Sequence, residues 1–297
     1  MNWYMEGGSR LKDLLYKNED ETFTVSYRKA LSHHMPANHF HSTFEVYYLL
    51  SGKREFFIKD RTFVVQEGDV IIISPNILHR TTNAEMPKYE RFIVNIHENF
   101  MGSVNQAYQE IFQPLFEQEY IIVRCSLQEQ LWIESLCQKV SQEIIDEMPG
   151  FEMYAQTLVL QLLIICCRHV KQNSIESLEY PSPMHERISE IVRYMNNHYM
   201  NDLSLNLVAE KFYVSPYYLS RFFKEATGFT FVEYLNSVRI KEAKKLLEHS
   251  SMKVNLIYKK VGFRSITHFG RVFKSITGYA PLHYRKSGSR GQVPRPK

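Results

Sequence analysis

The sequence reads SPYYLSRFFKEATG at residues 215–228 and SITHFGRVFKSITG at residues 265–278. The two stretches match at an offset of 50 residues, and the apolar residues within each return at intervals of three and four, which is typical of one helix face. Each stretch begins with a serine that can cap the first turn of a helix and ends with a glycine that suits the left-handed position after one. The pattern therefore predicts a duplicated helix.

A shorter helix is predicted before each copy, near residues 205–212 and 254–260. Two helices joined by a short turn describe a helix-turn-helix motif, whose second helix can enter the major groove of DNA. Between the copies, Thr230 and Glu233 can form a capping box at the start of a longer helix, whose charged face, including Arg239, is expected to lie in water. A helix of about 18 residues spans roughly 27 Å, which can hold two reading helices nearly one DNA turn, about 34 Å, apart.

The charge of the chain is divided between its two ends. The protein has 297 residues and a formal net charge of +4. Residues 184–297 contain 20 Lys/Arg and 8 Asp/Glu, whereas residues 1–183 contain 16 Lys/Arg and 24 Asp/Glu. A basic part of this size indicates a polyanionic partner, with double-stranded DNA first, and a solvated basic surface is the alternative.

Ten residues of the two copies are candidates for contact with DNA. Arg221 and Arg271 hold the same place in each copy, where an arginine fork can bond guanine O6 and N7 or clamp a phosphate. The alternative for each arginine is a structural ion pair or a solvated charge. Lys224 and Lys274 are expected to meet phosphate or water. The other candidates lie at the start of the two helices, and they are Pro216, Tyr217, Ser220, Ile266, Thr267 and Gly270.

The composition excludes several classes of protein. Hydrophobic residues make up 44% and charged residues 23% of the chain, which excludes disordered, collagen-like and coiled-coil classes. The longest apolar run, Leu158 to Cys167, is interrupted by Gln161 and falls short of the roughly 18–20 residues that cross a bilayer. No secretion signal is expected, and the four cysteines lack zinc-finger spacing. We expect reduced thiols in a cytoplasmic protein.

The N-terminal half shows the short, closely spaced apolar segments of an antiparallel sheet. Strands are predicted at residues 22–27, 45–50, 55–59, 62–65, 70–74, 90–97 and 120–124. Turn residues between them favour an antiparallel β-barrel or sandwich. The following residues, 126–171, are predicted to be helical and to open with a capping box of Ser126 and Glu129. These apolar helices are expected to pack against the barrel or against a second protomer.

One group of polar residues in this half has the chemistry of a binding site. Four of these residues stand at odd-numbered positions, namely His39, His41, Glu45 and Tyr47. Because strand side chains alternate between faces, all four would project from one face of a regular strand. His79 follows at a distance that allows it to return on a neighbouring strand. Imidazoles with a carboxylate can hydrogen-bond an organic effector, or they can ligate zinc, iron, manganese or nickel. A purely structural role is the third possibility.

The C-terminal part resembles a known family. The duplicated motif, with Val-Gly-Phe-x-Ser at residues 261–265 and Pro-x-x-Tyr-Arg at residues 281–285, resembles the AraC/XylS family of bacterial transcription regulators over about 100 residues. The resemblance implies seven helices with two helix-turn-helix units, and an activator that acts with RNA polymerase. It also implies DNA-facing side chains, at Tyr217, Ser220, Arg221, Thr267, Gly270 and Arg271. Tyr258 departs from the pattern, because a small alanine is usual there.

The N-terminal half is similar to the cupin barrels. The string His39-x-His41-x-x-x-Glu45, followed by Gly68, Pro75 and His79, carries this resemblance, although a motif glycine is missing near residue 76. In metal-binding cupins the corresponding three histidines and glutamate hold one divalent metal, which implies His39, His41, Glu45 and His79 as ligands here. Sensor cupins attached to AraC-type domains often bind an organic effector without metal, so a divalent metal is an open possibility.

These features predict an α+β multidomain protein. We expect a cupin-like effector-sensing barrel at 1–125, a helical dimerisation or linker segment at 126–183, an all-α double helix-turn-helix domain at 184–287 and a disordered tail at 288–297. The expected function is a ligand-responsive, sequence-specific regulator, a homodimer that binds a small molecule such as a carbohydrate through His39, His41, Glu45, Tyr47 and His79. We expect no enzyme, because the sequence contains no phosphate loop, nucleophile elbow or His-Glu-x-x-His helix. A metal-dependent cupin enzyme fused to a DNA-binding module and a constitutive DNA-binding scaffold are the alternatives.

Overall fold

The computed structural model describes residues 13–19, 22–30, 41–83, 88–97, 100, 106–172 and 180–288. The N-terminal elements are β1 (Leu14–Lys17), β2 (Phe23–Ala30), β3 (Phe44–Ser51), β4 (Lys53–Ile58), β5 (Arg61–Gln66), β6 (Asp69–Ile73), β7 (His79–Asn83), β8 (Tyr89–Ile96), α2 (Gln106–Phe116), β9 (Tyr120–Arg124), α3 (Leu127–Asp146) and α4 (Phe151–Gln172). The C-terminal elements are α5 (Pro183–His198), α6 (Leu205–Lys211), α7 (Pro216–Thr227), α8 (Phe231–His249), α9 (Val254–Lys260), α10 (Ile266–Thr277) and α11 (Pro281–Gly288). The structure thus has the predicted α+β architecture.

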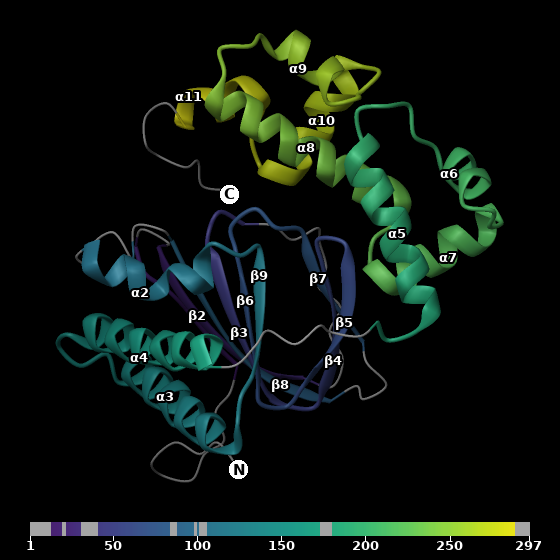
Figure 1. The fold of residues 1–297 in the computed structure, drawn as a ribbon. Helices are drawn as coiled ribbons and strands as arrows, with labels where there is room; N and C mark the ends of the chain where they lie inside the picture. The colour runs from purple at the N-terminus through teal and green to yellow at the C-terminus, as the bar shows by residue number, and fades with distance from the viewer. Residues whose placement is uncertain are drawn as a thin grey trace.

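Two antiparallel sheets face each other in the N-terminal half (Figure 1). The larger sheet has the strand order β1-β2-β8-β3-β6-β9, and the smaller has the order β5-β4-β7. Among the described residues no backbone ladder joins the two sheets. The predicted barrel is therefore an open, cupin-like sandwich rather than a closed barrel.

Alternation along the strands separates the two faces of the larger sheet. On β3, Tyr47 and Leu49 face the smaller sheet and help to fill the interior of the sandwich. Their neighbours Val46 and Tyr48 face the other way and join the core beneath α3 and α4. Because successive strand side chains point to opposite faces, one strand serves both cores.

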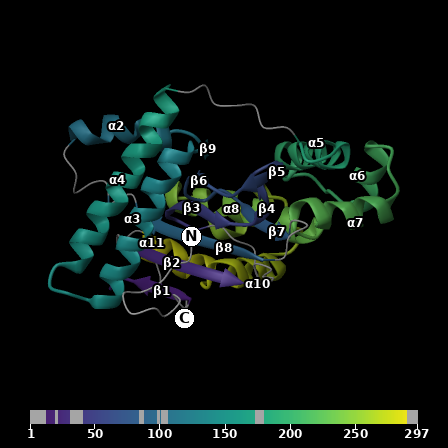
Figure 2. The same ribbon diagram turned by 90° about the horizontal axis from the view of Figure 1, so that it is seen from below.

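The smaller sheet is covered on its outer face by the C-terminal helices, on the side away from α3 and α4 (Figures 1 and 2). Phe57 of β4 is buried in the core that α5, α7 and α8 form. Its ring meets those of Phe229 and Tyr234, with centroids 6.2 and 5.9 Å away. The hydroxyl of Tyr234 donates to the backbone carbonyl of Lys59 at 2.8 Å. The N-terminal and C-terminal halves therefore share an apolar core.

The duplicated helices form as the sequence predicts. The hydroxyl of Ser215 accepts from the backbone N–H of Tyr218, and α7 ends at Gly228 in the left-handed region with φ 74°. In the second copy Ser265 caps α10 in the same way, and Gly278 ends it with φ 79°. Helix α8 contributes buried residues to the cores of both helix-turn-helix units. It therefore joins them rigidly.

The structure corrects the prediction that Arg239 lies in water. Its side chain is only 9% exposed, and it donates from Nε to the carbonyl of Tyr199 and from Nη2 to that of Asn201, each at 2.9 Å. The charge is compatible with burial because the guanidinium donates to two backbone carbonyls at and just after the end of α5. Arg239 ties the two helix-turn-helix units together instead of facing DNA.

Three elements were absent from the prediction, namely β1, β7 and α2. Strand β1 has only four residues, β7 reads HRTTN without apolar alternation, and α2 contains Pro114.

Helix α4 is long and apolar enough to cross a membrane by length and composition alone, although its uninterrupted apolar run is short. Its buried residues pack with α3 and the larger sheet in one core, as expected of a core helix.

Candidate effector site and DNA-binding surface

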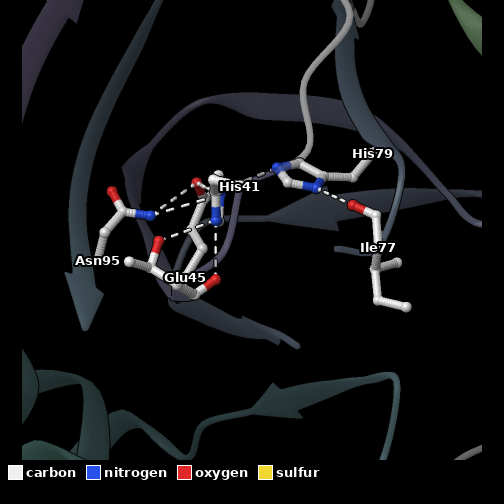
Figure 3. Close-up of polar contacts among 6 residues, drawn as sticks. His41, Glu45, Ile77, His79 and Asn95 are labelled. Atoms are coloured by element: carbon white, nitrogen blue, oxygen red, sulfur yellow. Dashed lines mark hydrogen bonds and ion pairs between the residues drawn. The ribbon is translucent and has the colours of Figure 1, made fainter. Parts of the chain in front are cut away.

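Three of the predicted site residues meet at one end of the sandwich interior (Figure 3). His41 lies just before β3, Glu45 is on β3 and His79 opens β7 of the facing sheet. Glu45 pairs with Asn95 across the β3–β8 ladder, so β8 adds an amide to the cluster. Glu45 is 1% exposed and His79 is fully buried. His39 lies outside the described residues.

The Glu45 carboxylate is the centre of this cluster. Its Oε2 lies 3.2 Å from His41 Nε2, and its Oε1 lies 3.8 Å from His79 Nε2. The two imidazole rings are 5.2 Å apart at an angle of 74°. Asn95 Nδ2 donates to Glu45 Oε2 at 3.4 Å. Each carboxylate oxygen therefore faces one imidazole.

Backbone carbonyls fix the orientation of both imidazoles. His41 Nδ1 lies 2.8 Å from the carbonyl of Thr43, and His79 Nδ1 lies 2.8 Å from the carbonyl of Ile77. A carbonyl can only accept, so each Nδ1 carries a hydrogen and each Nε2 faces Glu45. The two Nε2 atoms are thus presented either as donors to the carboxylate or, when neutral, as lone pairs to a ligand.

The protonation of this cluster follows from its burial and its pairing. Burial favours a raised pKa for the Glu45 carboxyl, but the interactions with His41 and His79 outweigh burial and hold this pKa well below its usual range. Burial also favours a lowered pKa for His79, and the proximity of Glu45 outweighs it, so the pKa of His79 is raised. The buried carboxylate and the imidazole therefore stabilise each other as an ion pair.

The same residues fit a divalent metal. One ligand atom from each of His41, Glu45 and His79 lies within 4.8 Å of the others. Hydrogen bonds from the remote ring nitrogens to backbone carbonyls are also the usual support for metal-bound histidines. Two imidazoles and one carboxylate would leave open positions for zinc, iron, manganese or nickel to bind a further ligand.

Tyr47 follows Glu45 on the same inner face, deeper in the sandwich. Its ring packs against Phe56 with centroids 4.7 Å apart, and its hydroxyl is buried. Sequence reasoning missed Arg54, Arg91 and Asn95, which also line this interior. The parity of β8, on which Arg91, Ile93 and Asn95 alternate with buried apolar residues, is the signal that could have found two of them.

The candidate DNA contacts lie on the surface of the two second helices. Nine of the ten residues, divided between the two copies, are exposed. The tenth, Gly270, is half-buried, with nothing within 4 Å of the place where a Cβ would be. Neither Arg221 nor Arg271 makes an ion pair within the described part of the chain, which removes the alternative of a structural ion pair there. Tyr258 is accommodated because its ring packs partly buried against the second core.

Comparison with known proteins adds the family. Residues 23–163 match the AraC-like ligand binding domain, and residues 208–287 match a helix-turn-helix domain. The chain belongs to the AraC family of transcriptional regulators. It therefore joins a domain that binds an effector to one that binds DNA, and the expected ligand-responsive regulator is confirmed.

Several AraC-family proteins are similar over most of their length. The uncharacterized HTH-type transcriptional regulator YisR of Bacillus subtilis is 25% identical over 261 residues, which cover 84% of this chain and 88% of YisR. The HTH-type transcriptional activator RhaS of Escherichia fergusonii is 25% identical over 239 residues, which cover 80% of this chain and 78% of RhaS. Among solved structures, apo ToxT of Vibrio cholerae aligns with a TM-score of 0.39 and 16% identity, over 91% of this chain and 99% of ToxT. That superposition is too loose to inform the site.

Proposed function

We propose that this AraC-family regulator holds its effector inside the sandwich against His39, His41, Glu45, Tyr47 and His79, and that occupancy alters the support of the DNA-binding helices. The observation that carries this proposal is the position of the smaller sheet. Its inner face lines the cluster around Glu45, and its outer face packs on α5, α7 and α8. An effector that displaces this sheet must also displace the core that it shares with the first helix-turn-helix unit.

The DNA-binding part of the proposal uses the two exposed second helices. We assign base contacts to Arg221 and Arg271, because each is an exposed fork without an ion pair in the described chain, and phosphate contacts to Lys224 and Lys274. The residues at the helix starts complete the reading surface, namely Pro216, Tyr217, Ser220, Ile266, Thr267 and Gly270.

The proposal also includes a homodimer that activates transcription with RNA polymerase in the cytoplasm. Large apolar side chains on the outer faces of α3 and α4 support the dimer, because Leu127, Leu131, Trp132 and Met153 are exposed. Sedimentation of the full chain tests this: we expect a dimer that Leu131→Glu with Trp132→Glu converts to a monomer. A monomeric wild type would contradict the proposed dimer.

The domain boundaries near residues 125, 183 and 287 stay predictions, and the tail from 289 lies outside the described residues.

A screen of small molecules tests the sensing role. We expect at least one compound to raise the melting temperature of the full chain and to change its affinity for DNA, with both effects reduced in Glu45→Gln. Arg168→Gln, on the exposed face of α4, serves as the control. If no compound changes the melting temperature, the constitutive scaffold is favoured instead.

A metal-dependent cupin enzyme is the second candidate, favoured by the three ligand atoms within 4.8 Å of one another. Such an enzyme predicts one metal ion per chain in the purified protein, and loss of that ion in His79→Gln. Elemental analysis without stoichiometric metal would remove this candidate, and it would leave the effector-binding role of the same residues intact.

A further inference from the structure

A second polar cluster lies in the sandwich interior, away from Glu45. Arg91 of β8 lies opposite Leu49 of β3, and Tyr47 occupies the next inward position of β3. Strands rise about 3.4 Å per residue, so Leu49 and Arg91 lie about 14 Å along β3 from Glu45. The polar groups of the interior are therefore separated into the cluster of Glu45 with its two histidines at one end and a basic end at the other, with Tyr47 between them.

Basic groups come to this end from three strands. Arg91 lies opposite Arg28 on the β2–β8 ladder, and Arg54 enters from β4 of the facing sheet, two residues before Phe56. Arg54 is 1% exposed, and its guanidinium stacks over the ring of Tyr89 at 4.2 Å. Like charges on directly opposed strand positions destabilise a sheet, so Arg91 opposite Arg28 favours a negative group beside Arg91.

Two donors at this end have no partner in the protein. The Tyr47 hydroxyl is buried and makes no hydrogen bond. One Nη atom of Arg91 is also buried without a hydrogen-bond partner. Arg91 makes no ion pair with any carboxylate of the described residues, whereas Arg28 pairs with Asp13 at 3.3 Å. A buried donor without an acceptor loses its hydration without compensation.

The electrostatics of the cluster agree with this geometry. Burial lowers the pKa of Arg54, and the charge of Arg91 adds to the lowering. The buried hydroxyl of Tyr47 has no acceptor in the protein, and a tyrosine hydroxyl can donate. Guanidinium groups donate only, and a set of converging donors with positive charge is the chemistry that binds carboxylate or phosphate oxygens.

We infer that Arg54, Arg91 and Tyr47 bind an oxyanion of the effector, so that the effector is a small organic acid or a phosphate ester. The inference rests on the proposed effector site and names the class of its ligand. The Glu45 carboxylate at the other end is already compensated by His41 and His79, so the oxyanion of the ligand is assigned to the basic end. A neutral carbohydrate would leave Arg91 and Tyr47 without a partner, whereas an acidic sugar would satisfy them.

Matched pairs of compounds test this inference on the full chain at constant ionic strength. The probes are glucuronate against glucose, benzoate against benzamide, and glucose phosphate against glucose. We expect at least one anion to raise the melting temperature saturably while its neutral counterpart does not. Arg91→Gln and Tyr47→Phe should each weaken the binding of that anion by on the order of tenfold or more. Arg168→Gln should leave the affinity for the anion unchanged. A response to carboxylates alone or to the phosphate alone identifies the oxyanion. If no anion distinguishes the wild type from Arg91→Gln, the inference is wrong.

The stability of Tyr47→Phe without ligand gives a second test that does not depend on the choice of probe or on the folding of Arg91→Gln. A hydroxyl kept for a ligand has no partner in the free protein, so its removal should leave the melting temperature equal or higher. A clear fall would assign Tyr47 a structural role and overturn the inference.

Specific DNA binding by the same preparations separates the anionic ligand from the proposed regulator. Retained DNA binding without an anion response contradicts only the anionic ligand, and loss of both contradicts the regulator.

Discussion

His79 and Arg80 are consecutive residues of β7 that face opposite sides of the smaller sheet. The His79 imidazole lies 3.8 Å from Glu45 Oε1, whereas the Arg80 guanidinium lies over the ring of Phe229, 5.3 Å from its centroid. The Arg80 stem also contacts Gly228, the residue that ends α7. A single strand therefore separates the proposed effector cluster from the end of a DNA-reading helix, and a displacement of β7 would reach that helix directly.

Substitution of Gly228 tests this contact. We expect Gly228→Ala to destabilise the protein by about 1–2 kcal/mol through its left-handed backbone, and further because the new Cβ would lie 2.5 Å from Arg80 Cδ. Gly150→Ala, at φ 88° with nothing within 4 Å of the place where a Cβ would be, should show the backbone cost alone. Urea unfolding of both variants, with and without Arg80→Ala, measures the difference. Equal losses at the two glycines, with no recovery by Arg80→Ala, would contradict the contact.

The Glu45–His79 ion pair predicts a pH dependence of stability. The pKa of His79 is raised above 6.5 in the fold, so its stabilising contribution is complete below pH 6.5 and is lost as the pH rises through the raised pKa. The pKa of Glu45 is lowered below 4.5, so its contribution is present above pH 4.5 and is lost as the pH falls. We expect His79→Gln to flatten the alkaline decline of the unfolding free energy, measured with a chelator present. An unchanged decline would argue against the pair, and His268→Gln, on the exposed surface, is the control.

Arg221 and Lys224 should differ in how they contribute to DNA binding. Arg221→Ala should cost about 1–3 kcal/mol on the preferred site and relax its specificity, whereas Lys224→Ala should weaken all sequences similarly and reduce the salt slope by about 1. Titrations at several salt concentrations on preferred and random duplexes separate the two effects. If Arg221→Ala weakens both duplexes equally, Arg221 contacts phosphate and not a base.

The four cysteines should be unreactive in the native protein. Each is a buried free thiol, and burial raises the pKa of Cys125 to about 12 and that of Cys167 to about 11. Because the thiolate is the reactive form, a thiol reagent at neutral pH should modify none of them until the chain unfolds. Rapid modification of the native protein would contradict the packing of these residues beneath the larger sheet.

Much of the fold could be predicted because its signals are local. Serine caps, left-handed glycines and apolar spacing depend on neighbouring residues, so the duplicated helices were confirmed nearly to the residue. Strand β7 was missed because its polar sequence is stabilised by pairing with β4 rather than by its own alternation. Arg239 was assigned to solvent because its partners, Tyr199 and Asn201, lie some forty residues earlier in the chain.

The candidate site divides in the same way. Parity predicted that His41 and Glu45 share one face of a strand; the structure brings them together, but His41 lies before the first residue of β3 rather than on the strand. The contribution of His79 followed from its motif resemblance, and the structure brings it to Glu45. Arg54 and Arg91 could not be placed, because their proximity depends on which sheet faces which, and that arrangement is a property of the whole sandwich.

Selection of bound duplexes from random DNA, with the full-length protein at near-physiological salt, tests the central claim most directly. An AraC-family regulator with two reading helices held by α8 should enrich a site with two blocks about one helical turn apart. Arg221→Ala should lose one block and Arg271→Ala the other. Salt-sensitive binding without an enriched sequence, in the presence of an effector that stabilises the protein, would contradict the claim that this chain reads DNA sequence.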